Sequence, residues 1–304
     1  MAYINTVKKL PYIYQDITAK NSNSLLVVTA AVHGNEMVGL KAIDTLSDIV
    51  SKIPLKGRIV VIHGNPEATA QGVRYVDQDF NRAFTATNLN SEPTNHELVS
   101  AQHLNQLMLN LLDEQASNTT KHLLDIHSMS STGTPFMSFV ADKPPQLIIE
   151  QTPIPVIEGI IDSLEGCLAK WFAPHFSSSH IVECGQHQEQ STFNFGFHTL
   201  IYHLYLFDML EDCEQVQQAF DYLSSHTYPY SYLKTNICYR QAVNKDQIFE
   251  MQPGFVNLQQ VNAGQLLAKI SGKKVLAPFD GRVILPCYQR QCEEGYFISQ
   301  DRQR

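Results

Sequence analysis

The sequence predicts an α/β fold, in which strands of a largely parallel sheet alternate with helices, followed by a smaller all-β region. Over roughly the first two thirds of the chain, short apolar runs alternate with segments of helical period, which is typical of a parallel sheet covered by helices. From Tyr228 onward the helical period is lost, and glycines separate short alternating runs. We therefore predict an α/β domain over residues 1–226 and a C-terminal β domain over residues 227–304.

The expected elements follow from these patterns in chain order. The run Leu25 to Ala31 is rich in β-branched residues and predicts the first buried strand, and the helical period of Met37 to Ser51 ends before Pro54. Further strands are expected at Arg58 to Ile62, Leu123 to Ile126, Leu147 to Ile149 and His180 to Val182. Further helices are expected at Thr94 to Glu114, Glu158 to Lys170 and Phe193 to Cys213, with a polar loop over Gln71 to Phe84.

Composition and charge narrow the classes of function. The net charge is -8 and no basic run is present, which argues against binding to nucleic acid or to anionic membranes. The most hydrophobic long segment is interrupted by two histidines and an aspartate, so it predicts a buried helix and not a membrane span. Met1 to Gln15 shows no secretory signal, and the six cysteines lack paired zinc-finger spacing, so we expect reduced thiols and a cytoplasmic protein.

Polar side chains follow three of the expected strands at the point where each strand ends. His33 and Glu36 come after the first strand, His127 after the third and Glu183 after a later one. Because ligands bind at the carboxyl ends of the strands in an open α/β sheet, we expect these groups to meet. Two imidazoles and one carboxylate are a known zinc ligand set with a position left for water, so His33, Glu36 and His127 are the predicted metal ligands. A strand-end histidine with a glutamate at a helix start is the simpler alternative for the first pair.

The remaining groups predict a hydrolytic site. Glu183 is the free carboxylate placed to act as a general base toward water, with a salt-bridged glutamate as its alternative. In the loop before residue 84, Arg74 can polarise a carbonyl, and Arg82 with Asn81 can hold a carboxylate. Asp79 can fix the tautomer of a metal-bound histidine. A solvated loop of mixed charge is the alternative for this segment.

The ordered motifs carry a family resemblance. The segments His33-Gly34-Asn35-Glu36, Asp79-Phe80-Asn81-Arg82 and Asp125-Ile126-His127, followed by Glu183, closely resemble the succinylglutamate desuccinylase and aspartoacylase family. The resemblance implies a zinc carboxypeptidase-like mixed sheet, one zinc ion per chain, and hydrolysis of the amide bond of an N-acyl amino acid. It places the metal ligands on His33, Glu36 and His127, the catalytic glutamate on Glu183, the carbonyl-side arginine on Arg74, and the carboxylate clamp on Asn81 and Arg82.

The sequence departs from the family where a second substrate carboxylate would be held. In the family that this chain resembles, members that cleave acyl-aspartate carry another arginine shortly before the catalytic glutamate, which holds the second carboxylate. No arginine stands in this chain between Arg82 and Arg240. Lys143 or Lys170 offers only a point charge in its place. Apolar residues stand nearby at Phe136, Met137, Phe139, Trp171 and Phe172. We therefore expect a substrate with one obligatory carboxylate and a remainder less acidic than that of acetyl-aspartate.

Two other functions remain open from the sequence. A zinc carboxypeptidase acting on short peptides would use the same residues, because Arg82 can equally hold a peptide C-terminus. A catalytically inactive binding protein of the same fold is the second alternative. We read the C-terminal β region as a lid or a dimerisation element whose loops edge the pocket, which makes a homodimer one expectation.

Overall fold

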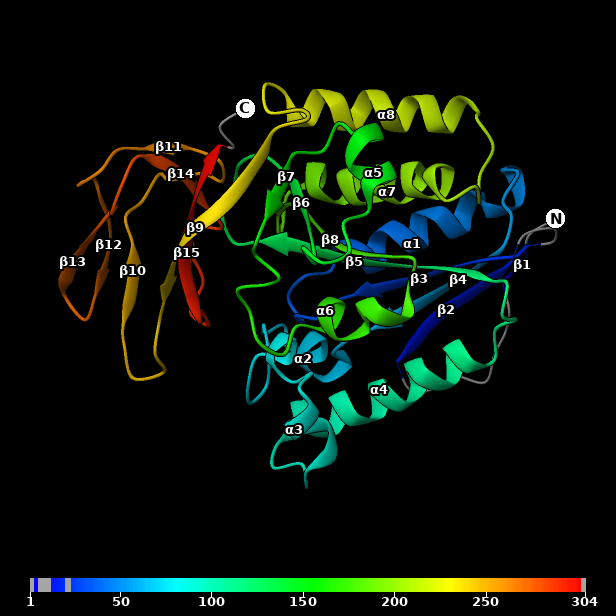
Figure 1. Ribbon diagram of the computed structural model, residues 1–304, viewed down its shortest axis with the longest axis horizontal. Helices are drawn as coiled ribbons and strands as arrows, with labels where there is room; N and C mark the ends of the chain where they lie inside the picture. The colour runs from blue at the N-terminus through cyan, green and yellow to red at the C-terminus, as the bar shows by residue number, and fades with distance from the viewer. Residues whose placement is uncertain (1–2, 5–11, 20–22, 302–304) are drawn as a thin grey trace.

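The computed structural model describes residues 3–4, 12–19 and 23–301. Its main sheet has 12 strands of mixed direction, and a second sheet has 3 antiparallel strands (Figure 1). In spatial order the main sheet comprises β1 (Tyr3–Ile4), β2 (Ile13–Thr18), β4 (Arg58–His63), β3 (Ser24–Ala30), β5 (Thr120–Met129), β8 (Ser178–Gln186), β6 (Phe136–Phe139), β7 (Val156–Glu158), β9 (Lys234–Ala242), β15 (Glu294–Asp301), β14 (Gly281–Ile284) and β11 (Gln260–Val261). The small sheet comprises β10 (Phe249–Met251), β12 (Leu266–Ile270) and β13 (Lys273–Leu276).

Helices cover both faces of the main sheet. One layer contains α1 (Val38–Ile49), α5 (Gln146–Gln151), α7 (Gln190–Leu206) and α8 (Glu214–Thr227). The other contains α2 (Pro66–Gln71), α3 (Ala86–Asn90), α4 (His96–Asp113) and α6 (Leu168–Phe172) (Figure 1). The α/β fold class with a mixed sheet flanked by helices is therefore confirmed.

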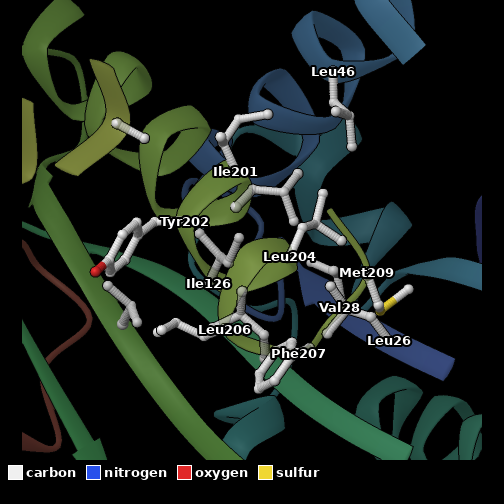
Figure 2. Packing of buried hydrophobic residues seen from close by; sticks show 14 of the residues in the cluster. Leu26, Val28, Leu46, Ile126, Ile201, Tyr202, Leu204, Leu206, Phe207 and Met209 are labelled. Atoms are coloured by element: carbon white, nitrogen blue, oxygen red, sulfur yellow. The ribbon is translucent and has the colours of Figure 1, made fainter. Parts of the chain in front are cut away.

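The two helical layers explain why β3 is apolar at successive positions. Leu26 and Val28 belong to the core cluster that α7 covers, where they lie with Leu204 (Figure 2). Leu25 and Val27 point to the opposite face and join the cluster of α4. Alternate side chains of a strand face opposite sides of a sheet, so a strand buried on both faces needs an unbroken apolar run. Truncating Leu26 to alanine would cost about 2–5 kcal/mol.

Several expected elements are correct, two are wrong, and a third is too long. Leu147 to Ile149 is not a strand, because these residues lie in α5, which begins directly after Pro145. Glu158 to Lys170 is not one helix: the segment contains the end of β7, turns with positive φ at Gly159 and Gly166, and the start of α6. The helix expected to reach Cys213 ends at Leu206, since Asp208 takes a φ of 57°, and α8 follows as a separate helix.

The C-terminal strands continue the main sheet. β7 pairs in parallel with β9, which places Val156 opposite Lys234, and β9 then pairs with β15. The division at residue 227 stays a prediction, and the sheet runs across it. None of the described helices has both the length and the apolarity to cross a bilayer.

The expectation of six reduced thiols is wrong for one pair. Cys287 and Cys292 form a disulfide in the segment between β14 and β15, whereas Cys167, Cys184, Cys213 and Cys238 are free. The prediction rested on the absence of zinc-finger spacing, and two cysteines five residues apart in a loop do not show that spacing. Of the segment Met1 to Gln15, which showed no secretory signal, residues 1–2 and 5–11 lie outside the described residues.

Candidate metal centre and its pocket

The carboxyl ends of β3, β5 and β8 lie side by side. These strands are neighbours in the sheet and run parallel, and His127 of β5 is the register partner of Glu183 in β8. The chain leaves β3 at Ala30 and brings His33 and Glu36 to the same edge. The sheet therefore gathers the four groups that the sequence predicts to meet.

Gly34 shapes the first of these turns. A Cβ at Gly34 would lie 2.2 Å from the backbone carbon of Ala68, so no side chain fits there. The Gly34 backbone N–H donates to the Arg74 carbonyl oxygen at 2.9 Å. The turn that carries His33 and Glu36 is thus packed directly against the loop that carries Arg74.

The two histidines among the predicted metal ligands both contact the carboxylate of the third, Glu36. His33 Nδ1 lies 2.8 Å from Glu36 Oε1, and His127 Nδ1 lies 2.9 Å from Glu36 Oε2. One donor atom from each of the three residues lies within 4.8 Å of the others, and all three residues are buried. The same nitrogen of each imidazole therefore faces inward.

The outward nitrogens of both histidines face aspartates. His33 Nε2 lies 3.1 Å from Asp79 Oδ1, and His127 Nε2 lies 2.9 Å from Asp125 Oδ2. The other oxygen of Asp125 accepts from the Thr29 hydroxyl at 2.6 Å. A carboxylate behind a ligating histidine fixes its tautomer and orientation, and Asp79 lies where that expected role requires it. Asp125 lies in the equivalent place behind His127, two residues before it on the same strand face.

The charges of this cluster suit a divalent cation. Burial favours neutral forms, but Asp125 and Glu36 hold the pKa of His127 well above its ordinary value. Against the same effect of burial, the two histidines hold the pKa of Glu36 well below its ordinary value. The buried carboxylate thus attracts positive charge between two nitrogens. A metal ion would replace the imidazole protons there, and two nitrogens with one carboxylate are donors that fit zinc.

Glu183 stands apart from the ligand set as a buried carboxyl. Its side chain lines the same pocket, and Oε2 has no hydrogen-bond partner among the described residues. Burial raises the pKa of Glu183 to about 7, an effect that Glu36 reinforces and His127 opposes. A carboxyl with a pKa near neutrality can both accept and return a proton at physiological pH.

Arg74 reaches the ligand cluster from the loop before η2 (Phe80–Arg82). Its Nη2 donates to Asp79 at 2.9 Å, and its Nη1 donates to Glu36 at 3.3 Å. Burial opposes the charge on Arg74, but Asp79 and Glu36 raise its pKa, so the guanidinium stays charged. The structure thus brings the predicted carbonyl-side arginine to the pocket.

Asn81 and Arg82 line the pocket too, but both already have protein partners. The Asn81 side-chain oxygen accepts from the Leu168 backbone N–H at 2.8 Å, which leaves its NH₂ group as the donor for a ligand. Arg82 Nη2 lies 2.6 Å from Glu294, and its Nε lies 3.5 Å from Glu293 without a hydrogen bond. A substrate carboxylate would therefore compete with these glutamates for Arg82.

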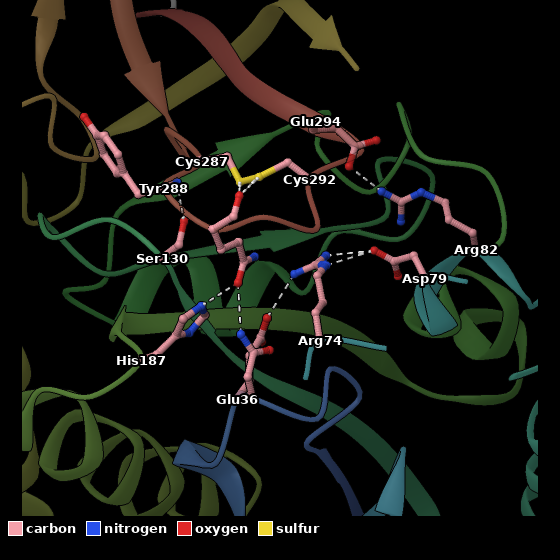
Figure 3. Close-up of a disulfide and its surroundings, with 12 residues drawn as sticks. Glu36, Arg74, Asp79, Arg82, Ser130, His187, Cys287, Tyr288, Cys292 and Glu294 are labelled. Carbon is pink, nitrogen blue, oxygen red and sulfur yellow. Dashed lines mark hydrogen bonds and ion pairs between the residues drawn. A yellow bond between two sulfur atoms is a disulfide. The ribbon is translucent and has the colours of Figure 1, made fainter. Parts of the chain in front are cut away.

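The pocket is roofed by the chain between β14 and β15. We call residues 285–293 the roof loop; it contains the disulfide, which lies above Glu36 and Arg74 in Figure 3. Together with Glu294 and Phe297 of β15, it walls a cavity of about 100 Å³. The expectation that C-terminal loops edge the pocket is confirmed, although the sequence did not identify which residues do so.

Lys143 and Lys170, the lysines that could replace a second arginine, lie outside the pocket at the metal cluster. Lys143 Nζ donates to the Ala173 and Phe176 carbonyl oxygens, and Lys170 Nζ donates to the Asp162 carbonyl oxygen at 3.3 Å. Neither lysine lines the cavity at the metal cluster. The apolar set named from the sequence does not line it either. Its apolar walls are instead Ile160, Ile161, Leu164, Ile181, Leu285 and Phe297.

Comparison with known sequences agrees with the resemblance seen in the motifs. Residues 22–150 match the family model described as the succinylglutamate desuccinylase/aspartoacylase catalytic domain. The succinylglutamate desuccinylase of Ectopseudomonas mendocina is 30% identical over 112 residues, which are 36% of this chain and 32% of that protein. The match thus spans about a third of the curated relative's length.

Solved structures share the fold over nearly the whole chain. A succinylglutamate desuccinylase from Vibrio parahaemolyticus superposes with a TM-score of 0.68 at 14% identity, covering 95% of this chain and 86% of that one. Murine aminoacylase 3 superposes with a TM-score of 0.57 at 16% identity, covering 93% and 97%. The likeness includes the C-terminal strands, which lie outside the matched sequence segment.

Proposed function

We propose, from the match of residues 22–150 to the model of the succinylglutamate desuccinylase/aspartoacylase catalytic domain, that this protein is a zinc-dependent deacylase of small N-acyl amino acids. One observation carries the proposal: His33, Glu36 and His127 converge with their inward atoms, while a separate buried carboxyl, Glu183, shares their pocket. The same site would hold one zinc ion per chain. Zinc, when bound, polarises a carbonyl and lowers the pKa of water.

The protein's own residues supply the remaining steps. Glu183 accepts a proton from the attacking water and passes it to the nitrogen of the leaving amino acid. Arg74 faces the place where negative charge develops on the carbonyl oxygen and stabilises it. Arg82 and the Asn81 NH₂ group receive the single carboxylate of the substrate, which displaces Glu294 from Arg82.

The substrate we propose has one carboxylate and a less acidic acyl or side-chain part than acetyl-aspartate. The pocket offers Arg74 and Arg82 as its arginines, and acidic groups already engage both. Isoleucine, leucine and phenylalanine side chains supply an apolar part of the wall. A second substrate carboxylate would face Glu293, whose pKa is raised by burial and by Asp79. A cytoplasmic location stays a prediction, although the Cys287–Cys292 disulfide removes one of the arguments for it. A homodimer also stays a prediction.

A substrate panel with and without metal tests the proposal. The metal-free protein, reloaded with zinc, should release amino acid from apolar acyl-amino acids faster than from acetyl-aspartate or succinyl-glutamate. A clear preference for the two diacids would refute the substrate class. Hydrolysis of dipeptides without deacylation would indicate a carboxypeptidase instead. A zinc-loaded protein that binds acyl-amino acids without turnover would indicate a binding protein.

A further inference from the structure

Among the roof-loop residues, Gln291 bonds directly to the backbone of the loop that carries Arg74. Its side-chain oxygen accepts from the Arg74 backbone N–H at 3.0 Å, and its side-chain nitrogen donates to the Tyr75 carbonyl oxygen at 3.0 Å. One amide side chain thus holds both ends of a dipeptide unit that is more than 200 residues away in sequence.

The backbone of Arg74 is fixed from two sides. Its carbonyl oxygen accepts from Gly34 in the metal-ligand turn, and its N–H is held by Gln291. Its guanidinium is held by Asp79 at 2.9 Å. With its far end tied to Asp79 and Glu36 and its backbone tied to Gln291 and Gly34, the Arg74 side chain is restrained at both ends. Loss of the Gln291 contact would free one backbone restraint, and the guanidinium would be held less closely in place.

The roof loop is itself held in place around Gln291. The disulfide between Cys287 and Cys292 closes a short loop that contains Gln291. Within the same loop, Gln289 accepts from Asn35 at 2.9 Å, and the Tyr288 N–H donates to the Ser130 hydroxyl at 3.0 Å. Gln291 therefore approaches Arg74 from a segment that is anchored on both sides of it.

We propose that Gln291 is a positioning residue of this site, which sets the position of Arg74 for stabilising charge on the substrate carbonyl. This inference rests on the proposed function. It adds that the C-terminal β region is part of the catalytic apparatus, because it supplies a contact that the α/β part lacks. The role predicts a loss in kcat with little change in KM, since Gln291 acts on a group that works in the transition state.

The test compares Gln291→Ala with Gln300→Ala, an exposed glutamine of the same region whose side chain donates only to the Asp280 carbonyl oxygen. Gln291→Ala should lower kcat by about 10-fold to 100-fold, as expected for a misplaced catalytic group, with zinc content unchanged. Amide hydrogen exchange in the peptide containing Arg74 should become faster. Gln300→Ala should match the unmodified protein in both measurements.

A double-mutant cycle with Arg74→Ala separates positioning from general destabilisation. If Gln291 acts through Arg74, Gln291→Ala should change kcat by less than about 2-fold once Arg74 is absent, because the two effects are coupled. Equal losses in both backgrounds, or an unchanged kcat in the single variant, would overturn the inference. If Gln291→Ala does not fold, Gln291→Glu decides: it keeps the acceptor for Arg74, loses the donor to Tyr75, and should show a smaller but measurable loss.

Turnover of the substrate panel by the unmodified protein distinguishes a failure of the proposed function from a failure of the role of Gln291. An unmodified protein that hydrolyses none of the panel would refute the proposed function, whereas normal turnover together with an unaffected Gln291→Ala variant would refute only the role of Gln291.

Discussion

His127 and Glu183 are register partners on two adjacent parallel strands, so one pairing fixes a predicted metal ligand beside the predicted base. Both strands are buried in the middle of the sheet, where slippage by one residue would turn every side chain to the opposite face. The relative position of the two groups is therefore set by the sheet and not by a loop.

Replacing Glu183 by glutamine should remove the base and keep the metal. We expect kcat to fall by about 10²-fold to 10⁴-fold, the usual contribution of general base catalysis. Zinc content measured by elemental analysis should stay at one ion per chain. Glu189→Gln, a change at an exposed glutamate shortly after β8, is the matched control and should keep full activity. Retained activity in Glu183→Gln would show that another group moves the proton.

Asp125 should control metal affinity without touching the metal. Asp125→Asn removes the charge that faces His127 Nε2 at 2.9 Å, and it should weaken zinc binding by about 10-fold to 100-fold. Competition with a chelator measures this affinity. Asp16→Asn provides a buried aspartate that pairs with Arg58 instead, so it should leave zinc affinity unchanged. Equal affinities in the two variants would refute the role of Asp125.

Glu294 should compete with the substrate carboxylate for Arg82. Its 2.6 Å ion pair with Arg82 would be lost in Glu294→Gln, which leaves the guanidinium freer to bind the substrate. We expect KM to fall by about 5-fold, corresponding to roughly 1 kcal/mol for such a pair. Asp301→Asn, which breaks the more exposed pair with Arg282, is the control. A KM that rises would mean that Glu294 holds Arg82 in its working position.

A cluster of two buried histidines and one partly buried histidine should make stability sensitive to acid. Burial lowers the pKa of His203 and of His122 to about 4, with His203 adding to the effect on His122, and burial holds the pKa of His180 well below its ordinary value. His203 stacks on His180 with ring centroids 5.0 Å apart. The folded state takes up protons at these histidines less readily than the unfolded chain does. The stability that the neutral histidines contribute is therefore complete above pH 7 and is lost as the pH falls from about 6.5 toward 4.

The replacement His203→Leu tests this dependence. Between pH 7 and pH 5, the free energy of unfolding should fall by about 2 kcal/mol less in the variant than in the unmodified protein, because one buried group no longer takes up a proton on unfolding. Denaturant titrations of the metal-free proteins at both pH values measure the difference. Parallel loss of stability in the two proteins would show that other groups dominate.

The ligand cluster was predictable because its signals are local. His33 and Glu36 lie three residues apart after a strand, and the end of a parallel strand is a predictable location for His127 and Glu183. Strand β3 was equally clear, since its apolar run is continuous and β-branched. Helix α2 was missed although Asn65 caps it, Pro66 starts it and Gly72 ends it with a φ of 66°.

The errors arise where tertiary contacts decide. A three-residue apolar run such as Leu147 to Ile149 suits a strand or a helix turn, and only the packing of α5 against α7 selects one. Which residues of the roof loop and of β15 line the pocket could not be predicted from the sequence for another reason. Gln291 and Glu294 have no local pattern, and their importance comes from contacts with residues more than 200 positions earlier.

The pairing of β7 with β9 also bears on how the chain can be divided. A fragment ending before β9 would expose the unpaired edge of β7 inside what is now a continuous sheet, and such an edge invites pairing with other molecules. It would also lose the roof loop that covers the pocket. Heating the full chain should therefore give one cooperative melting event, and shortened forms should precipitate instead of retaining partial activity.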